Sequence, residues 1–208
     1  MSEYFIPTGA GEAEFTEKRS RFLGHVRRVE SEEEARSFIA EMKKKYYDAR
    51  HNCWCYILHE GPERYSDDGE PQGSAGLPML EVFRREGIEN LVCVVTRYFG
   101  GVLLGTGGLL RAYTKSAKDA LDAAGRSVVR RWVTVDLPCS YASLERYKLE
   151  LSSFGGAVGE IEYGAAVTIH ALLPEDKSEA FRARIFDLSG GSVTVAVTGE
   201  SYQDVPVG

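Results

Sequence analysis

Hydrophobic and polar residues follow two different periods along the first fifty positions of the chain. Residues 14–30 alternate apolar side chains with charged ones, as expected of a strand or hairpin with one buried face. Ser31 comes next, with Glu34 three residues later, which is the spacing of a capping box at a helix start. Apolar residues then recur at helical spacing to about Tyr46, so we expect an amphipathic helix there.

Longer apolar stretches in the following residues predict buried strands and further helices. Two of them, Cys53–Leu58 and Leu91–Thr96, are short and continuous, which favours strands covered on both faces. Glycine and proline break the polar segment between them, so Arg64–Gly76 is expected to be a loop. The predicted helices are 77–86 and 106–125, the second capped by Thr106.

The second half of the chain repeats a simpler order. A strand-like segment over Val128–Val135 is either the last strand of the first domain or the segment that leads out of it. The elements after it follow the βαββαβ order of the ferredoxin-like plan. We expect these elements at residues 133–137, 142–154, 157–163, 167–173, 175–188 and 192–198. The predicted fold class is therefore α+β, with a first domain of residues 1–132 and a smaller ferredoxin-like domain of residues 133–208.

Composition is that of a soluble globular protein with room for two cores. Of 208 residues, 43% are hydrophobic and 27% are charged, and the formal net charge is −6. The acidic excess lies mostly in residues 137–208, which carry 5 Lys and Arg against 10 Asp and Glu. Such a segment repels a polyanion, so any nucleic-acid contact is expected to come from a local patch on the first half.

No feature of the sequence predicts export or membrane insertion. The cysteines lie in or beside apolar segments, as buried reduced thiols of a cytosolic protein do. Met1 to Tyr4 lack the basic region followed by an apolar core that a signal peptide requires. No apolar run approaches the roughly 20 residues of a membrane span. We therefore expect a cytoplasmic protein without a membrane partner.

The most informative segment runs from Val94 to Tyr113, where an apolar strand leads into a glycine-rich turn and then a helix. Glycine adds no packing, so its abundance indicates that something must approach the main chain closely. A glycine-rich turn that opens a helix also exposes N–H groups beside the positive end of the helix dipole, which suits an anion. We predict a phosphate-contacting surface of Arg97, Tyr98, Gly100, Gly101, Gly105, Gly107, Gly108 and Arg111.

A second segment, Ser66–Gly76, brings three carboxylates to a small-residue entry into a helix. In one interpretation Asp68 or Glu70 pairs with Arg97 and directs that guanidinium toward a phosphate or a base. In another, the carboxylates hold a divalent cation or a ribose hydroxyl. In a third, the acids only cap helix ends and neutralise a buried arginine. Because loops often carry function, we favour a functional role and add Asp68 and Glu70 to the predicted binding residues.

Other chemistries have less support in the sequence. The glycine turn lacks the lysine of a P-loop, and no Ser-His-Asp arrangement is apparent. In an extended strand His51, Cys53, Cys55 and His59 share one face, and four such N and S ligands suggest zinc, but the two histidines would lie about 26 Å apart. We therefore predict buried core cysteines, and neither a metal, a cofactor nor catalytic residues.

The two glycine-containing segments together resemble the IMPACT family, specifically its bacterial YigZ-type members. The resemblance covers Arg19 to about Gly125. It rests on Asp67-Asp68-Gly69-Glu70-Pro71 with Gly73-Ser74-Ala75-Gly76, and on Arg97-Tyr98-Phe99-Gly100-Gly101, Leu104-Gly105 and Gly107-Gly108-Leu109. It implies a first domain similar to the second domain of ribosomal protein S5, followed by the ferredoxin-like accessory domain of YigZ-type proteins. This tandem is similar to the last two domains of the ribosomal translocase elongation factor.

The function implied by the resemblance lies in translation, with RNA or the ribosome as the partner. Eukaryotic members regulate initiation through a protein partner but bear an extra N-terminal recognition domain, so that particular partnership is not carried over, and a translation-regulatory protein partner stays open. We expect a non-enzymatic protein that binds RNA through the glycine-rich, arginine-bearing surface. Two alternatives remain, namely an enzyme acting on a nucleotide or other small phosphorylated substrate, and a protein-docking module.

Overall fold

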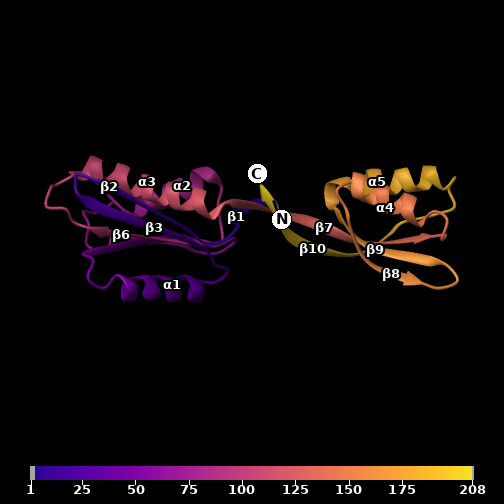
Figure 1. The fold of residues 1–208 in the computed structure, drawn as a ribbon, viewed down its shortest axis with the longest axis horizontal. Coiled ribbons are helices and arrows are strands. Elements are labelled where there is room, and N and C mark those ends of the chain that lie inside the picture. The colour runs from indigo at the N-terminus through magenta and orange to yellow at the C-terminus, as the bar shows by residue number, and fades with distance from the viewer. Residues whose placement is uncertain (1–2, 208) are drawn as a thin grey trace. The chain divides into compact units, whose positions relative to one another are not determined.

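A computed structural model of the chain describes residues 3–207, with side chains through Val205. The chain divides into two compact units, each considered by itself (Figure 1): Tyr4–Val128 with residues 205–207, and Val129–Asp204 with Glu3. The division falls four residues before the boundary that we placed after residue 132. Three residues lie outside the described residues, namely Met1, Ser2 and Gly208. Met1 and Ser2 belong to the stretch from which we predicted that a signal peptide is absent, and Gly208 ends the second predicted domain.

The first unit is built on a five-stranded sheet with the order β2-β3-β6-β4-β5. Its neighbouring strands are antiparallel. The strands are β2 (Gly11–Glu17), β3 (Ser20–Arg28), β4 (His51–Ile57), β5 (Glu63–Ser66) and β6 (Leu91–Tyr98). β6 lies in the centre and is buried on both faces, which explains why its sequence is a continuous apolar run rather than an alternating one.

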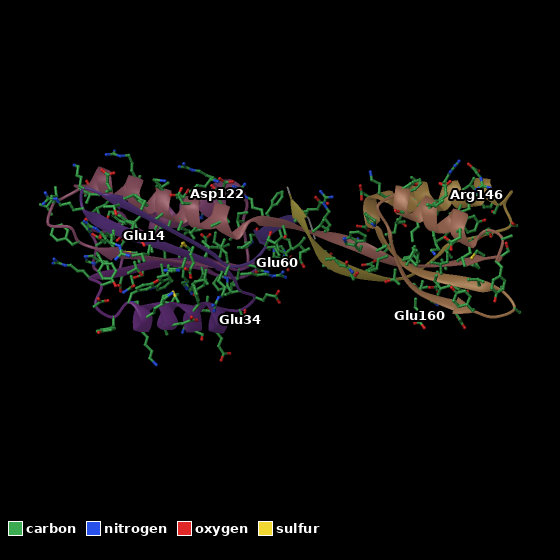
Figure 2. The ribbon with its side chains drawn as sticks, viewed as in Figure 1. Glu14, Glu34, Glu60, Asp122, Arg146 and Glu160 are labelled. Atoms are coloured by element: carbon green, nitrogen blue, oxygen red, sulfur yellow. The ribbon has the colours of Figure 1, made fainter. Side chains whose placement is uncertain are left out.

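Helices cover both faces of this sheet (Figure 1). Helix α1 (Glu32–Lys45) packs on one face, where Val92 and Val94 of β6 join its core. Helices α2 (Gly76–Glu86) and α3 (Thr106–Ala124) pack on the other, with Cys93 and Val95. Charged side chains on the outer helix faces, such as those of Glu34 and Asp122 in Figure 2, stay exposed.

The start of α1 follows the predicted cap with one difference. The Ser31 hydroxyl accepts a hydrogen bond from the Glu34 N–H at 3.2 Å, as the capping box predicts. The Glu34 carboxylate, however, accepts from the N–H of Glu30 at 2.8 Å. The reciprocal hydrogen bond of the capping box is therefore donated by Glu30, the residue before the cap, and not by Ser31 itself.

Helix α3 lies unusually close to the sheet. A Cβ on Gly24, in the middle of β3, would stand 2.5 Å from the carbonyl oxygen of Ser116 on α3. A Cβ on Gly11 of β2 would overlap the backbone of Ala120 and Ala124. Glycine at both positions thus lets the helix axis approach the strands, and this contact holds the second half of α3 against the sheet.

The second unit has the predicted ferredoxin-like order. Its elements are β7 (Arg126–Cys139), α4 (Leu144–Ser153), β8 (Ala157–Tyr163), β9 (Val167–Pro174), α5 (Glu175–Leu188) and β10 (Ala196–Val207). β9 pairs antiparallel with both β7 and β8, and β10 pairs with β7. The two helices contribute buried Tyr147, Leu151, Phe181 and Ile185 to a core that lies against one face of the sheet.

Several predicted boundaries differ from the structure. The two strands expected between 128 and 137 form the single strand β7, and the last strand begins at Ala196 rather than at residue 192. The expected loop 64–76 contains most of the short edge strand β5, and a further strand, β1 (Tyr4–Pro7), was not predicted. None of the helices in the described part of the chain is long and apolar enough to cross a membrane.

The contact between β3 and α3 yields a stability prediction. Gly24→Ala should lower the free energy of unfolding by about 1–3 kcal/mol, because its methyl group would have to displace the backbone of α3. Urea denaturation followed by circular dichroism measures this change. Gly9→Ala is the control, since no atom lies within 4 Å of its added Cβ. Equal stability of the two variants would contradict the proposed packing constraint.

Candidate functional site

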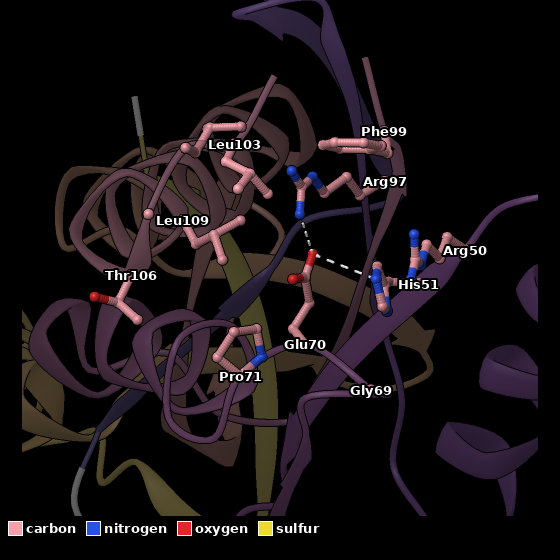
Figure 3. Close-up of a pocket in the computed structure, with 12 residues that line it drawn as sticks. Arg50, His51, Gly69, Glu70, Pro71, Arg97, Phe99, Leu103, Thr106 and Leu109 are labelled. Atoms are coloured by element: carbon pink, nitrogen blue, oxygen red, sulfur yellow. Dashed lines mark hydrogen bonds and ion pairs between the residues drawn. The ribbon is translucent and has the colours of Figure 1, made fainter. Parts of the chain in front are cut away.

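A pocket of about 430 Å³ lies in the first unit beside the start of α3, and we call it the α3 pocket (Figure 3). Three segments line it: the start of β4, the loop after β5, and the stretch from the end of β6 into α3. The lining residues are Arg50, His51, Gly69, Glu70, Pro71, Arg97, Phe99, Leu103, Leu104, Gly105, Thr106 and Leu109. The volume is within the range of small-molecule sites.

An ion pair between Arg97 and Glu70 forms the floor of the pocket. Arg97 Nη1 donates to Glu70 Oε1 at 2.6 Å, and the two side chains are 6% and 3% exposed. Of the two acids considered as partners of Arg97, Glu70 makes this contact. The guanidinium also lies 5.5 Å from the ring centres of Phe22 and Phe99, so it is stacked as well as paired.

Other groups converge on the same carboxylate. The Tyr113 hydroxyl donates to Glu70 Oε1 at 2.9 Å, and His51 Nε2 lies 3.9 Å from that oxygen. Burial raises the pKa of Tyr113 far above its usual value, so its hydroxyl remains a donor. Burial likewise raises the pKa of the nearby Cys53 thiol, which makes Cys53 a poor nucleophile at neutral pH.

Asp67 and Asp68 have structural contacts instead. Asp67 Oδ1 accepts from the N–H groups of Ala75 and Gly76 at 3.0 and 2.8 Å, which satisfies the start of α2. The carboxylate of Asp68 accepts from Lys43 Nζ at 2.6 Å and from the N–H of Asn52 at 2.7 Å. Neither aspartate lines the α3 pocket, so the structure brings Glu70 to Arg97 without Asp68.

The glycines of the turn serve different purposes. A Cβ on Gly100 would overlap the carbonyl group of Arg19, whereas Gly101 and Gly105 have φ of +82° and +71° and nothing within 4 Å of an added Cβ. Gly105 is the N-cap of α3 and provides no side-chain hydrogen bond. The prediction that Thr106 caps the helix is therefore wrong: Thr106 is its first residue, because the chain enters α3 through the left-handed region at Gly105.

Gly107 and Gly108 are the second and third residues of α3. A Cβ on Gly107 would lie 3.7 Å from Arg111 Nη1, and one on Gly108 would lie 3.0 Å from Leu104 Cβ. The exposed Arg111 lines a second hollow, of about 240 Å³, together with Lys18 and Lys115. This second hollow shares Leu104 with the α3 pocket, so the two lie next to each other.

Tyr98 and Phe99 point in different directions. The Tyr98 hydroxyl donates to Asp48 Oδ1 at 2.8 Å, and its ring lies 5.7 Å from the guanidinium carbon of Arg21. The adjacent Phe99 is 41% exposed and lines the pocket. Phe99 is thus an aromatic site residue that the sequence prediction omitted, although alternation along a strand places it on the same face as Arg97.

Sequence reasoning also missed Arg50 and His51 as pocket residues. His51 pairs in register with Arg97 across β4 and β6, which is a long-range relation that no local pattern reveals. Its candidate zinc partners lie apart: Cys53 and Cys55 are buried and free, and His59 Nδ1 contacts Glu89 Oε2 at 2.5 Å. Among the described residues, no group of three or more His, Cys, Asp or Glu is arranged to hold a metal ion.

Comparison with known proteins places this fold in a family. Residues 18–121 match the Impact N-terminal domain. Over 193 residues the chain is 37% identical to the IMPACT family member YvyE of Bacillus subtilis, covering 92% of this chain and 89% of that one. The chain belongs to the IMPACT family. Residues 137–192 of this IMPACT family member also match a domain of unknown function (DUF1949).

Further relatives show how far the likeness to the IMPACT family extends. The chain is 31% identical to IMPACT family member YigZ of Escherichia coli over 204 residues, 96% of this chain and 100% of that one. A crystal structure of a hypothetical protein superposes with a TM-score of 0.60 at 31% identity, covering 95% and 98% of the two chains. The rat Protein IMPACT matches over 105 residues at 30% identity, 48% of this chain and 33% of its own.

The buried ion pair predicts a large loss of stability on truncation. Arg97→Ala should lower the free energy of unfolding by about 3–5 kcal/mol, because Glu70 would keep a buried charge without a partner. Arg50→Ala, at an exposed position of the same pocket, should change it by less than about 0.5 kcal/mol. Thermal and chemical denaturation of both variants check this. An Arg97→Ala protein as stable as the parent would refute the buried pair.

Proposed function

We propose that this IMPACT family member binds single-stranded RNA, free or in the ribosome, and through that contact takes part in the regulation of translation. The binding surface consists of the α3 pocket, the second hollow beside it and their rims. The observation that carries the proposal is the uncapped start of α3, which opens onto the pocket between exposed cations. The relation to the eukaryotic IMPACT proteins is compatible with this role.

The helix start provides an anion site of backbone groups. The first N–H groups of any α-helix have no partner within the helix, and they lie at the positive end of its dipole. In α2 the carboxylate of Asp67 satisfies such groups. In α3 the cap is Gly105, and no hydrogen bond to the N–H groups of residues 106–108 occurs within the described part of the chain. A phosphate can occupy the place that Asp67 takes at α2.

Cations flank this helix start on two sides. Arg50 lies at the α3 pocket, and Lys18 and Arg111 lie at the second hollow. All three are exposed, and none of them has an acidic partner among the described residues, in contrast to Arg97. Glu17 is the acidic residue in the lining of the second hollow. The arrangement supports a few phosphate contacts along a strand, and therefore a modest affinity that falls as salt rises.

An exposed aromatic ring lines the same pocket as Arg50 and the start of α3. Phe99 is 41% exposed at the α3 pocket, and Leu103, 82% exposed, lies across from it. Bases of single-stranded RNA stack on such rings, whereas bases within a duplex do not present their faces. The combination of ring, helix start and cations therefore favours a single strand over a double helix. In this proposal the base stacks on Phe99 and not on Tyr98, the aromatic residue that the sequence prediction included.

A second candidate function is an enzyme acting on a nucleotide or another small phosphorylated compound. The observation in its favour is the concave shape of the α3 pocket, with His51 and Glu70 3.9 Å apart inside it. Histidine and carboxylate pairs serve general acid–base catalysis in many enzymes. Incubation of the protein with nucleotides, followed by chromatography, separates the two functions. Conversion to a product supports the enzyme, and unchanged nucleotides support the binding protein.

The RNA-binding proposal predicts a specific salt dependence. Fluorescence anisotropy with a labelled single-stranded RNA should show an affinity that falls linearly in log–log form as salt rises. Arg50→Ala and Arg111→Ala should each reduce the slope by about 0.7, the value for one phosphate contact on a single strand. Arg85→Ala is the matched control, because Arg85 is exposed and cationic but lines neither hollow.

Two results would contradict the proposal. One is the absence of any association with RNA or with sedimented ribosomes at low salt. The other is an equal loss of affinity in the Arg85→Ala control and in the two site variants, because that would indicate attraction to overall charge rather than to this surface.

A further inference from the structure

The α3 pocket combines apolar walls with a polar floor. Phe99, Leu103 and Leu109 provide the walls, and the ion-paired Arg97 and Glu70 with His51 provide the floor (Figure 3). A phosphate alone would leave the apolar walls facing water. A flat, heteroaromatic ring with polar atoms on one edge fits both parts, because its faces contact the walls while its edge reaches the floor.

The floor offers two hydrogen-bond acceptors. Glu70 Oε1 already accepts from Arg97 and Tyr113, whereas Oε2 has no partner within the described residues. His51 Nδ1 lies 2.9 Å from the carbonyl oxygen of Asp68. A carbonyl only accepts, so Nδ1 carries a proton, and in this tautomer Nε2 is the acceptor of the imidazole. The 3.9 Å between Nε2 and Glu70 Oε1 is too long for a hydrogen bond, which leaves Nε2 available.

The floor also presents a donor group, the guanidinium of Arg97. Arg97 Nη1 is bonded to Glu70 and Nη2 to the Ser20 hydroxyl at 3.4 Å, but Nε is buried without an acceptor in the described structure. The side chain is 94% buried, and Figure 3 shows its guanidinium directed into the pocket. Nε is covered by protein atoms, so an acceptor on a ligand in the pocket would instead bond the second hydrogen of Nη1 or Nη2.

One donor beside two acceptors matches the hydrogen-bonding edge of guanine. That edge carries the acceptor O6 next to the donors N1–H and N2–H₂. Adenine, cytosine and uracil each offer one donor group on the corresponding edge. The start of α3 lines the same pocket, so the phosphate of the same nucleotide has a place beside Gly105 and Thr106.

We propose that the α3 pocket binds one unpaired guanine nucleotide of the RNA, with the base edge on Arg97, Glu70 and His51. This inference rests on the proposed RNA binding and adds a base preference to it. Phe99 stacks on the base, and the N–H groups at the α3 start hold the phosphate. The remaining cations, Lys18 and Arg111, contact the neighbouring nucleotide without reading its base.

Mononucleotides test the preference on the unaltered protein, so no variant has to fold. Calorimetric titration with GMP, IMP, AMP and UMP compares ligands that share one phosphate and differ in the base. GMP should bind most tightly. IMP lacks only the 2-amino group and should bind about 10-fold more weakly, as expected for the loss of a base-reading hydrogen bond.

A variant pair tests the stacking wall. Phe99→Ala should weaken GMP binding by about 10-fold, because stacking on an aromatic ring contributes substantially to each bound base. Tyr65→Ala is the matched control, since Tyr65 is 46% exposed on β5 and does not line the pocket. Equal binding of GMP by the control and the unaltered protein, with a loss in Phe99→Ala, supports the inference.

The outcomes separate this inference from the proposed function. Equal affinity for all four mononucleotides, or binding of none of them, would overturn the guanine preference. Salt-dependent RNA binding in the same protein would then still support the proposed function. A preference for GMP without any RNA association would overturn the proposed function, and with it the assignment of the guanine to RNA.

Discussion

The buried ion pair between Glu70 and Arg97 holds the candidate site together. It joins the loop after β5 to the end of β6 through a 2.6 Å contact between side chains that are almost completely buried. Two such charges are tolerable together, whereas either one alone would be very unfavourable. The loop therefore cannot leave the strand without a large loss of free energy. Since both segments line the α3 pocket, the pair also determines its shape.

The three acids of the loop after β5 have different roles. Asp67 satisfies the start of α2, and Asp68 ties the loop to Lys43 of α1 and to the backbone of Asn52 in β4. Glu70 alone among the three lines the pocket. Because its charge cancels that of Arg97, the interior is close to neutral and the unpaired cations lie at the rim. The rim of the site thus presents charged side chains, and the interior presents hydrogen-bonding and apolar groups.

Local patterns in the sequence predicted the parts of the structure that depend on local forces. The spacing of apolar residues predicted the bounds of α1, α5 and β8 closely, and the glycines predicted a turn at the start of α3. The short, polar strand β5 was not predicted because an exposed edge strand has no run of apolar residues that would mark it in the sequence. His51 was not placed in the pocket because only the register of β4 against β6 brings it opposite Arg97. The choice of Tyr98 over Phe99 disregarded the alternation of side chains along a strand.

The tight contact of α3 with Gly11 and Gly24 has a further consequence. A helix whose backbone rests directly on two strands has little freedom to slide or tilt, because protein interiors resist compression. The contacts lie in the second half of α3, and because a helix is stiff they also limit the movement of its start at the pocket. Rigid recognition elements avoid much of the ordering entropy that association otherwise costs. For the proposed RNA contact, preorganisation of this kind favours selectivity even though the surface is small and its contacts are few.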